Sequence, residues 1–310
     1  MQVLHGLAGL RSLPAGAVVS IGNFDGIHLG HQEILKTAKQ LVPAGKASAL
    51  VVLTFEPHPL TVLRPAEAPP RLTSLEMKHG LLESAGVDYL AVLEPEPAVL
   101  GMTASQFWEL LRDQLRASHL VEGKSFRFGK GATGTIQTLR EWSANSTLRL
   151  HVVDSVTVPL LDLQIAPVSS SLIRFLVTFG RVREAGLCLG RAYQLRGKVI
   201  KGLGRGRKLG VPTANLQTNG TLVPGDGVYA GRCTIDGQSY AAAVSIGSMP
   251  TFTENIRQVE AHLLDFDGDL YGRDISVDLV DWLRDQRRFV GADQLVTQIG
   301  KDIKETRKRA

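Results

Sequence analysis

Hydrophobic residues follow two different patterns along the chain. In the first half, continuous apolar runs alternate with segments whose apolar residues recur at helical spacing. The runs predict buried strands at residues 17–21, 49–55, 89–93 and 148–153. The helical segments cover residues 32–41, 75–82 and 104–111. Because strands that alternate with helices form right-handed crossovers, this half predicts an α/β domain with a parallel sheet covered on both faces.

Short strands separated by turn residues dominate the second half. They are expected at residues 193–200, 227–235, 240–246, 259–266 and 274–280. Regular short strands of this kind predict a small antiparallel β-barrel. Asp-Gly pairs at residues 236–237 and 267–268 predict hairpin turns, because glycine tolerates the positive φ that tight turns require.

A final helix and a change of pattern complete the expected organisation. Residues 293–308 place apolar side chains on one face at helical spacing, which predicts a C-terminal amphipathic helix. The alternation of strands and helices gives way to short strands within residues 183–191. We therefore expect an N-terminal α/β domain over residues 1–183 and a C-terminal barrel domain over residues 184–310.

Composition limits the class of protein. The 310 residues suffice for two domains, and 44% hydrophobic with 21% charged residues is typical of globular proteins. Cys188 and Cys233 lack partners at zinc-binding spacing, which argues against a disulfide framework or a zinc site and favours a cytoplasmic location. The first residues do not resemble a secretion signal and no apolar run reaches membrane-spanning length, so no membrane association is expected.

A net charge of +5 is compatible with two kinds of anionic partner. Nucleic acid is one, and small phosphorylated substrates such as ATP are the other. Aromatic residues make up only 6% of the chain and do not interleave with the basic ones as stacking platforms would. Charge and aromatic content together therefore favour small-molecule anions over nucleic acid as partners. They do not indicate an oligomeric state.

Residues 22–31, GNFDGIHLGH, stand where a predicted strand passes into a predicted helix. The first N–H groups of a helix are unpaired and its dipole is positive there, so a phosphate group binds well at such a junction. His28 and His31 follow one another within a turn, and imidazoles can donate hydrogen bonds to a leaving pyrophosphate. A structural role is the alternative for each histidine, but the pair beside glycines favours a nucleotide site.

A second segment carries groups that suit phosphate. Ser169 and Ser170 stand at the expected start of a helix, and Arg174 follows one turn later. Hydroxyl groups cap a helix start, and a guanidinium binds phosphate oxygens. Alone, this segment predicts no more than a capped helix with a surface arginine; together with the histidines it predicts the other wall of an ATP site.

The second half of the chain holds a separate set of polar groups. Residues 197–215 are rich in glycine and basic residues, and they end in Pro-Thr-Ala-Asn. A basic loop for nucleic acid is one interpretation, but the hydroxyl of Thr213 and the carboxamide of Asn215 offer hard oxygen ligands for Mg²⁺. Glu260 lies in an otherwise apolar alternating strand. It is either an exposed strand residue or a base for an alcohol that is being phosphorylated.

These motifs resemble one enzyme family over almost the whole chain. The motif G-N-F-D-G-x-H-x-G-H, the loop F-E-P-H-P at residues 55–59 and the segment S-S-S-L-I-R resemble the adenylyltransferase module of prokaryotic bifunctional riboflavin kinase/FMN adenylyltransferase, also called FAD synthetase. The glycine-rich segment ending in P-T-A-N, the segment at residues 246–252 and the V-E-A-H stretch at residues 259–262 resemble its riboflavin kinase module. The resemblance implies a Rossmann-like nucleotidylyltransferase domain followed by the kinase barrel.

The resemblance also implies reactions and residue roles. Riboflavin would be phosphorylated by MgATP to FMN in the barrel, and FMN would be adenylylated by a second ATP to FAD in the α/β domain. Catalytic roles would fall to His28, His31, Arg174 and Glu260. Substrate binding would fall to Gly22, Asn23, Asp25, His58, Ser169, Ser170, Lys201, Gly202, Gly210, Thr213 and Asn215. Of these residues, Thr213 and Asn215 would hold Mg²⁺.

Two alternatives remain open on the sequence. Residues 130–135 lack the arginine and the acidic residue that the family commonly has there, so the N-terminal domain could bind nucleotide without adenylylating FMN. The protein would then be a riboflavin kinase only. A non-catalytic RNA-binding or flavin-sensing module is the alternative of another class, and it would bind without turning over ATP.

Overall fold

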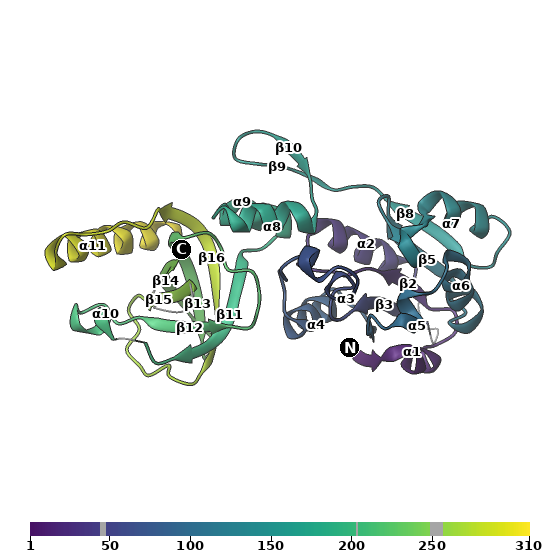
Figure 1. Cartoon of the computed structure of the whole chain (residues 1–310), viewed down its shortest axis with the longest axis horizontal. Helices are drawn as coiled ribbons and strands as arrows, with labels where there is room; N and C mark the ends of the chain where they lie inside the picture. The colour runs from purple at the N-terminus through teal and green to yellow at the C-terminus, as the bar shows by residue number, and fades with distance from the viewer. Residues whose placement is uncertain (44–47, 203, 249–256) are drawn as a thin grey trace. The chain divides into compact units, whose positions relative to one another are not determined.

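A computed structural model describes residues 1–43, 48–202, 204–248 and 257–310 of the chain (Figure 1). Their internal contacts divide the chain into two units, Met1–Thr157 and Val158–Ala310. The expected motif residues 249–252 lie outside the described part of the chain. Among the described residues, none of the helices is both long and apolar enough to cross a membrane.

A parallel sheet forms the centre of the first unit, as the alternating pattern predicts. Its described strands follow the order β1-β4-β3-β2-β5-β8, and every neighbouring pair is parallel. The strands are β1 (Gln2–His5), β2 (Val18–Ile21), β3 (Leu50–Phe55), β4 (Tyr89–Leu93), β5 (His119–Gly123) and β8 (Arg149–Val153). Two of them, β1 and β5, are not among the expected strands. Both are short, and a glutamate interrupts the apolar run of β5.

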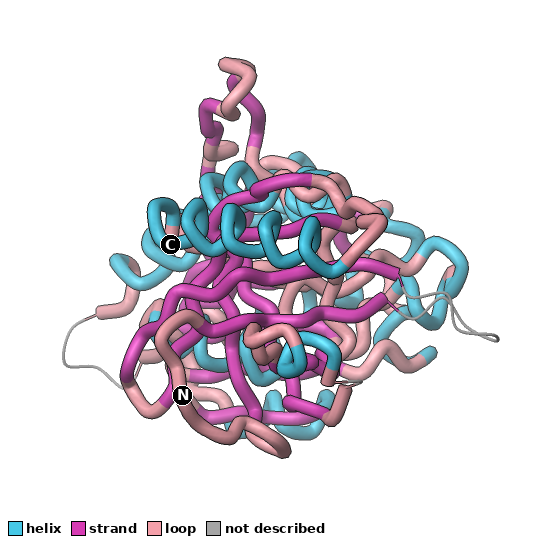
Figure 2. The backbone as a smooth tube through the Cα atoms, turned by 90° about the vertical axis from the view of Figure 1, so that its left-hand side faces the viewer, coloured by secondary structure: helices cyan, strands magenta, loops and turns pink. Residues whose placement is uncertain are grey.

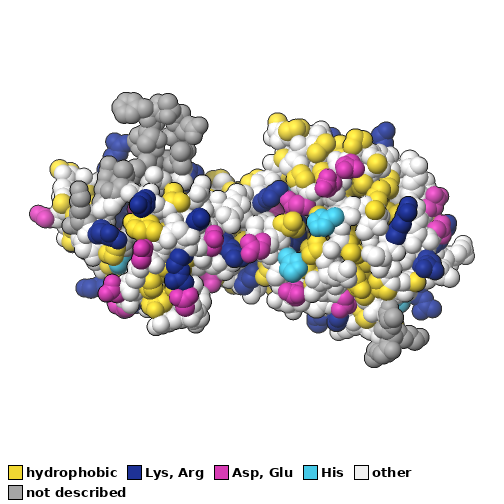
Figure 3. Space-filling model, turned by 90° about the horizontal axis from the view of Figure 1, so that it is seen from below, with side chains coloured by type: hydrophobic (Ala, Val, Ile, Leu, Met, Phe, Trp, Pro, Cys, Tyr) yellow, Lys and Arg dark blue, Asp and Glu magenta, His cyan; other side chains and the backbone are white. Residues whose placement is uncertain are grey.

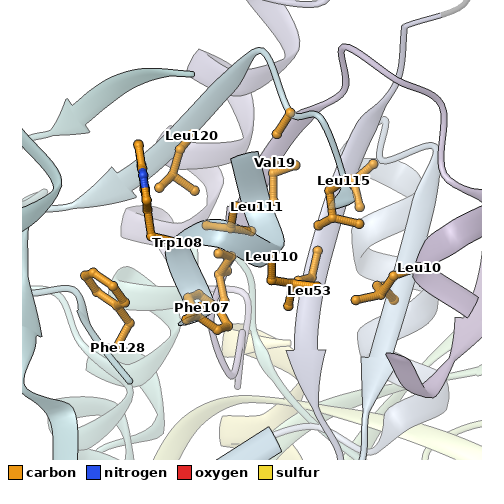
Figure 4. Close-up of a cluster of buried hydrophobic side chains, with 14 of the residues drawn as sticks. Leu10, Val19, Leu53, Phe107, Trp108, Leu110, Leu111, Leu115, Leu120 and Phe128 are labelled. Atoms are coloured by element: carbon orange, nitrogen blue, oxygen red, sulfur yellow. The ribbon is translucent and has the colours of Figure 1, made fainter. Parts of the chain in front are cut away.

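Successive residues of these strands face two separate hydrophobic cores. Val18 and Val52 lie in the core that Leu35 and Ala38 of one helix complete. Figure 4 shows the other core, in which Val19, Leu53 and Leu120 pack with aromatic side chains including Phe107 and Trp108. Because side chains alternate along a strand, a sheet buried on both faces requires the continuous apolar runs seen in the sequence.

The helices of the first unit cover this sheet and largely match the expected segments. They are α1 (Gly6–Gly9), α2 (Leu29–Gln40), α3 (Leu60–Leu63), α4 (Leu75–Ser84), α5 (Pro97–Leu100), α6 (Ala104–Glu109) and α7 (Ile136–Ser143). A π-helical turn continues α6 over Leu110–Gln114. A small hairpin of β6 (Arg127–Phe128) and β7 (Gly134–Thr135) precedes α7. The start of α2 lies three residues before the expected one, so His31 belongs to its first turn.

A closed antiparallel barrel forms the second unit's centre, as expected (Figure 2). Its described strands follow the order β11-β12-β15-β14-β13-β16, and β16 also pairs with β11. They are β11 (Tyr193–Ile200), β12 (Ala214–Thr218), β13 (Gly227–Ile235), β14 (Gln238–Ser248), β15 (Arg257–Leu263) and β16 (Asp274–Arg284). The strand β12 was not expected, because Ala214 and Leu216 are the only apolar residues among its five.

The two predicted hairpins have opposite outcomes. Asp236 and Gly237 adopt φ of 51° and 82° and join β13 to β14 in a two-residue turn, which confirms the first. The second prediction, at Asp267 and Gly268, is wrong. Strand β15 pairs with β12 and β14, whereas β16 pairs with β11 and β13, so the loop between β15 and β16 crosses the barrel instead of forming a hairpin.

The remaining elements of the second unit precede or cover the barrel. They are β10 (Ile165–Pro167), which pairs with β9 (Thr157–Pro159), and the helices α8 (Ser170–Thr178), α9 (Val182–Leu189), α10 (Arg205–Lys208) and α11 (Ala292–Arg309). Helix α11 confirms the expected amphipathic helix and lies across barrel strands β13, β14 and β16 (Figure 2). Helix α10 is a single turn inside the expected glycine-rich loop.

Candidate active sites

The motif GNFDGIHLGH lies at the point where the sheet order of the first unit reverses. The chain proceeds from β2 outward to β3 and β4 and then returns to β5 on the other side of β2. Ligands of open α/β sheets bind outside the carboxyl ends of the strands at such a switch point. Residues 22–31 follow the carboxyl end of β2 directly and lead into α2. The expected phosphate site therefore stands where this fold binds ligands.

Two stacked imidazoles mark the start of α2. His28 is the N-cap residue, and its Nδ1 accepts a hydrogen bond of 3.3 Å from the backbone N–H of His31. In a neutral His28 ring, the proton would therefore be on Nε2. The two rings lie 3.7 Å apart at 15°. Buried Nδ1 of His31 has no hydrogen-bond partner among the described residues, so a donor or acceptor is available beside the helix start.

Burial keeps the ring of His31 neutral. The pKa of His31 lies well below its usual range, first because burial penalises the charged form, and then because His28 and Lys78 are nearby positive charges. A neutral imidazole can donate a hydrogen bond without an added proton. An incoming triphosphate would favour protonation and so strengthen the contact as negative charge develops.

The turn that carries these residues is strained and firmly anchored. Phe24 and Ile27 adopt φ of 45° and 42°, a backbone conformation that non-glycine residues rarely take. The buried carboxylate of Asp25 accepts hydrogen bonds of 3.0 Å from the backbone N–H groups of Leu72 and Thr73. It also accepts one from the Thr73 hydroxyl. These bonds place Asp25 under the turn, where its carboxylate holds the turn in shape.

A buried lysine supports the same turn from α4. Lys78 is 4% exposed, and its ammonium lies 3.4 Å from the hydroxyl of Thr54, which in turn donates to the backbone oxygen of Asn23. The ammonium also lies 3.6 Å from a carboxylate oxygen of Glu56. Burial lowers the pKa of Lys78, while Glu56 and Asp25 oppose that effect. Lys78 was not predicted as a site residue, since a lone lysine on a helical face carries no signal in one sequence.

The loop F-E-P-H-P brings His58 to the start of the motif. The side-chain amide of Asn23 lies 3.0 Å from Nε2 of His58, and the backbone N–H of Leu60 donates to its Nδ1. The structure thus brings His58 and Asn23 together, as an extended ligand site would require. Gly22 connects this group to the sheet, because its N–H donates to the backbone oxygen of Leu53 at 3.0 Å.

The other predicted wall of the ATP site belongs to the second unit. Ser169 is the N-cap residue of α8, and its hydroxyl accepts a hydrogen bond of 3.2 Å from the N–H of Leu172. This confirms the predicted helix start. Ser170 and Arg174 lie in the first turns of α8. That these residues share one site with His28 and His31 stays a prediction.

In the barrel, two predicted residues stand on one face of two neighbouring strands. Asn215 of β12 is the register partner of Glu260 of β15, so the two side chains lie side by side. Thr213 lies just before the first residue of β12 and is partly exposed. The flanking residues Ala214 and Ala261 are buried in the barrel core, whereas Asn215 and Glu260 are partly exposed. This set therefore lies on the outer wall of the barrel.

Two cavities share Thr213, and the larger of them reaches the barrel core, because the buried Ala214 and Ala261 line it. One, of about 360 Å³, is lined by Thr213, Glu260 and apolar side chains that include Leu295 and Ile299 of α11. The other, of about 420 Å³, shares Thr213 and is lined by polar and charged residues as well as apolar ones, among them Arg207. The Thr213 hydroxyl is common to both cavities. The more apolar cavity suits a ring system, and the more polar one suits a phosphorylated compound held beside it.

The glycine-rich segment approaches the same residues closely. A Cβ on Gly202 would lie 2.3 Å from Nδ2 of Asn215, so any larger residue there would displace the carboxamide from its present position. Gly210 has φ of +76°, and a Cβ there would meet no atom within 4 Å, so its need for glycine is conformational. Lys201 is exposed beside Gly202. The segment therefore covers Asn215 with backbone groups rather than side chains.

Comparison with known proteins assigns the chain to two family models in succession. Residues 10–171 match the family described as FAD synthetase, and residues 189–310 match the family described as riboflavin kinase. A bifunctional riboflavin kinase/FMN adenylyltransferase of Bacillus subtilis is 36% identical, over 98% of this chain and 96% of its own length. Its counterpart in Escherichia coli is 34% identical, over 97% of this chain and 96% of its own length. The chain belongs to the bifunctional riboflavin kinase/FMN adenylyltransferase family.

Membership of this family makes the protein a transferase with two activities, riboflavin kinase and FMN adenylyltransferase, that both use ATP. The adenylyltransferase lies in the N-terminal part and the kinase in the C-terminal part, which confirms the predicted order. A solved structure with 30% sequence identity, from Streptococcus pneumoniae and titled a macrolide-efflux protein, has a similar fold with a TM-score of 0.89. Each chain is covered to 100% in that comparison.

The kinase part also contains residues that the sequence interpretation left without a role. The His262 ring donates from Nδ1 to the backbone oxygen of Pro212 at 2.7 Å, and so ties the segment before Thr213 to β15. Gln286 donates to the Ser245 hydroxyl at 2.9 Å and lines the apolar cavity together with Arg287. His262 could have been noticed because it alternates with Glu260. Gln286 and Arg287 lie in a polar segment without a motif or a regular spacing of apolar residues, so the sequence alone does not indicate them.

Proposed function

We propose that adenylyl transfer takes place where β2 passes into α2. The phosphate of FMN is already an anion, so it can attack the α-phosphorus of ATP without a general base. The bond from that phosphorus to the pyrophosphate breaks, and negative charge develops on the leaving oxygens. His28 and His31 donate hydrogen bonds to these oxygens, and Arg174 offsets their charge. The two stacked imidazoles at a helix start, of which burial keeps His31 neutral, are the observation that supports this assignment.

The remaining predicted residues of this part have positioning roles in the proposal. Gly22 and Asn23 present backbone and amide groups to the ATP phosphates, and Asp25 holds the turn that carries them. His58 lies beside Asn23 and contacts the flavin nucleotide. Ser169 and Ser170 offer the start of α8 to the nucleotide.

We propose that phosphorylation of riboflavin takes place in the barrel unit, beside Thr213 and Glu260, where the two cavities meet. The ring system occupies the apolar cavity beneath α11, and ATP occupies the more polar cavity that shares Thr213. Glu260 accepts the proton of the ribityl 5′-hydroxyl while that oxygen attacks the γ-phosphorus of ATP. ADP leaves, and FMN is the product. The register pairing of Glu260 with Asn215 supports this role, because it sets the base beside the phosphate-binding residues.

Mg²⁺ is part of the proposal for the barrel. Thr213 and Asn215 would hold it, and their hydroxyl and carboxamide oxygens are ligands that Mg²⁺ accepts together with nucleotide phosphates. The space that Gly202 leaves around the Asn215 carboxamide fits such a role. The metal would offset the charge of the transferred phosphoryl group. Lys201, Gly202 and Gly210 bring backbone and charge to the same phosphates.

The purified protein with riboflavin and MgATP gives the direct test. We expect FMN to form first and FAD to follow, with ADP and pyrophosphate as the two by-products. A parallel reaction with FMN and MgATP isolates the adenylyltransferase. FMN accumulation in the first reaction without FAD in either would support the kinase-only alternative that residues 130–135 raise. Absence of ATP turnover in both would support a binding module instead.

The functional division of the chain is a further part of the proposal. We place it at residues 183 and 184, within the stretch 172–188 that neither family match covers. The internal contacts divide the chain earlier, after Thr157, so α8 belongs to the second unit while its first residues belong to the FAD synthetase match.

A cytoplasmic location agrees with the free, buried thiols of Cys188 and Cys233. In Figure 3, basic and acidic side chains mix over the visible described surface, which agrees with small-molecule substrates.

A further inference from the structure

Strands β2 and β5 part at their carboxyl ends, beside the adenylyl-transfer site. Their pairing joins Val18 to His119 and Val19 to Leu120. The same register would continue with Ser20 opposite Val121 and Ile21 opposite Glu122, but within the described residues the pairing stops at Val19. On its other side, β2 stays paired with β3 through Ile21. The separation is therefore confined to the switch point.

β5 itself stays regular where it parts from β2. Its pairing with β8 runs over the whole strand and includes Glu122 with Val152 and Gly123 with Val153. The gap thus opens between two well-ordered strands rather than at a frayed end. In a parallel sheet, main-chain groups in such a gap lose their ladder partners and need others.

The side chain of Glu122 supplies one such partner. It is 2% exposed, and its Oε1 accepts a hydrogen bond of 2.7 Å from the backbone N–H of Ile21. Ile21 is the residue that the continued register would place opposite Glu122. The carboxyl group of Glu122 thus takes the place of a main-chain acceptor from β5. It connects the two strands at the point where their main chains are no longer paired. Gly22, the first residue of the motif, follows Ile21 directly.

The environment of Glu122 favours the neutral acid. Burial raises the pKa of its carboxyl well above the usual range, and only the hydrogen bond from Ile21 opposes that shift. A buried carboxyl group is costly unless it is hydrogen-bonded, and the apolar strands around it would pack a valine or isoleucine at lower cost. Its presence at this position therefore calls for a role.

We propose that Glu122 is a positioning residue for adenylyl transfer, which holds the carboxyl ends of β2 and β5 apart and fixes residues 22–31 against the bound nucleotide. The inference rests on the proposed adenylyl-transfer site. Direct contact between Glu122 and substrate is not part of it. The side chain acts through Ile21 on the turn that carries His28 and His31.

Glu122→Val and Glu122→Gln are the deciding pair of variants. Valine is what a regular parallel strand would place there, and it removes the acceptor for the Ile21 N–H. Because small displacements of positioned groups have large kinetic effects, we expect Glu122→Val to lower kcat/KM for FAD formation from FMN and ATP by about tenfold to a hundredfold. Glutamine keeps an acceptor oxygen at the same length, so Glu122→Gln should stay within about threefold of the unchanged protein.

Riboflavin kinase activity of the same molecules is the internal control, and it should not change in either variant. Amide hydrogen exchange at Ile21 supplies a structural readout, with faster exchange expected in Glu122→Val and unchanged exchange in Glu122→Gln. If Glu122→Val fails to fold, Glu122→Asp replaces it, because aspartate keeps the acid but shortens the side chain by one methylene. Glu122→Asp should then lose FAD formation while Glu122→Gln keeps it.

Unchanged FAD formation in the valine or aspartate variant would overturn the inference. Equal loss in Glu122→Gln and Glu122→Val would also overturn it, since that result requires the acid itself rather than its length. His31→Ala separates this failure from failure of the site. If His31→Ala leaves FAD formation intact, the proposed adenylyl-transfer site is wrong. If His31→Ala abolishes it while the Glu122 variants have no effect, only the inference about Glu122 fails.

Discussion

The two halves of this enzyme handle phosphate groups with different parts of their architecture. The site proposed for the adenylyltransferase half lies at the end of a parallel sheet, beside a helix start and two stacked imidazoles. Protein groups engage the nearby carboxylates of Asp25 and Glu56. The site proposed for the kinase half lies at the wall of an antiparallel barrel, where Glu260 stands in register with Asn215. The difference follows the nucleophile: a phosphate attacks as an anion, whereas an alcohol needs a proton acceptor.

Replacing Glu260 with glutamine gives the strongest test of this contrast. The change removes the proton acceptor but keeps the size of the side chain, so FMN formation from riboflavin should fall about 10²- to 10⁴-fold. FAD formation from supplied FMN should not change. Both reactions are measured by separating the flavins after incubation with MgATP. Glu305→Gln on the exposed side of α11 is the matched control, and an equal loss of both activities in Glu260→Gln would contradict the contrast.

His31→Ala tests the other half in the reverse direction. Loss of a preorganised donor to the leaving pyrophosphate should lower FAD formation about 10²- to 10³-fold and leave FMN formation unchanged. Release of pyrophosphate from FMN and ATP measures the first, and release of ADP with riboflavin measures the second. His5→Ala removes an exposed histidine of the same unit and serves as the control. A fall in kinase activity with the fold intact would show that the sites are not separate.

Most of the fold could be predicted, because it depends on local pattern. Continuous apolar runs and Asp236-Gly237 indicated β2, β3, β4 and the first barrel hairpin correctly. The missing elements have specific causes. Glu122 interrupts the apolar run of β5, and polar residues hide β12. Asp267-Gly268 failed because a dipeptide reports a tight turn but not which strands are neighbours in a closed barrel.

The sites were only partly predictable, because some of their groups act across the sheet. His28 and His31 carry a local signal, since their spacing and the helix start are both visible in the sequence. Lys78 and Glu122 do not, because their partners lie more than twenty residues away along the chain. Thr135, one of the residues that weakened the resemblance, is the N-cap of α7, so part of that departure has a structural reason. Asp25, expected to bind substrate, has its carboxylate turned to Leu72 and Thr73.

The neutral state of His31 predicts a dependence of stability on acid pH that belongs to the first unit. Its folded pKa lies below the ordinary value of 6.5, so the unfolded chain binds a proton first as the pH falls. The stabilising contribution is complete above pH 6.5 and decreases by about 1.4 kcal/mol for each pH unit below it, until the folded pKa is reached. His31→Asn should remove this decrease.

Urea unfolding at pH 7 and pH 5 measures this effect. Fluorescence of Trp108 and Trp142 reports on the first unit when Trp282 of the second unit is replaced by phenylalanine. The difference in unfolding free energy between the two pH values should be smaller in His31→Asn than in the parent protein. His5→Asn should behave like the parent. Equal differences in all three proteins would show that His31 is not held neutral by the fold.

Two glycine variants give the smallest expected effect and the finest distinction within the kinase half. Gly210→Ala meets no atom within 4 Å, but it forces alanine into φ of +76°, which costs about 1 kcal/mol of stability. Gly202→Ala instead brings a Cβ to 2.3 Å from the end of the Asn215 side chain. Because that carboxamide can rotate away, stability should hardly change, whereas the KM for MgATP should rise several-fold. Riboflavin kinase kinetics at varied Mg²⁺ concentration separate the two variants. A shift in Mg²⁺ dependence confined to Gly202→Ala supports Asn215 as a ligand. The same small shift in Mg²⁺ dependence in both variants would assign the segment a conformational role only.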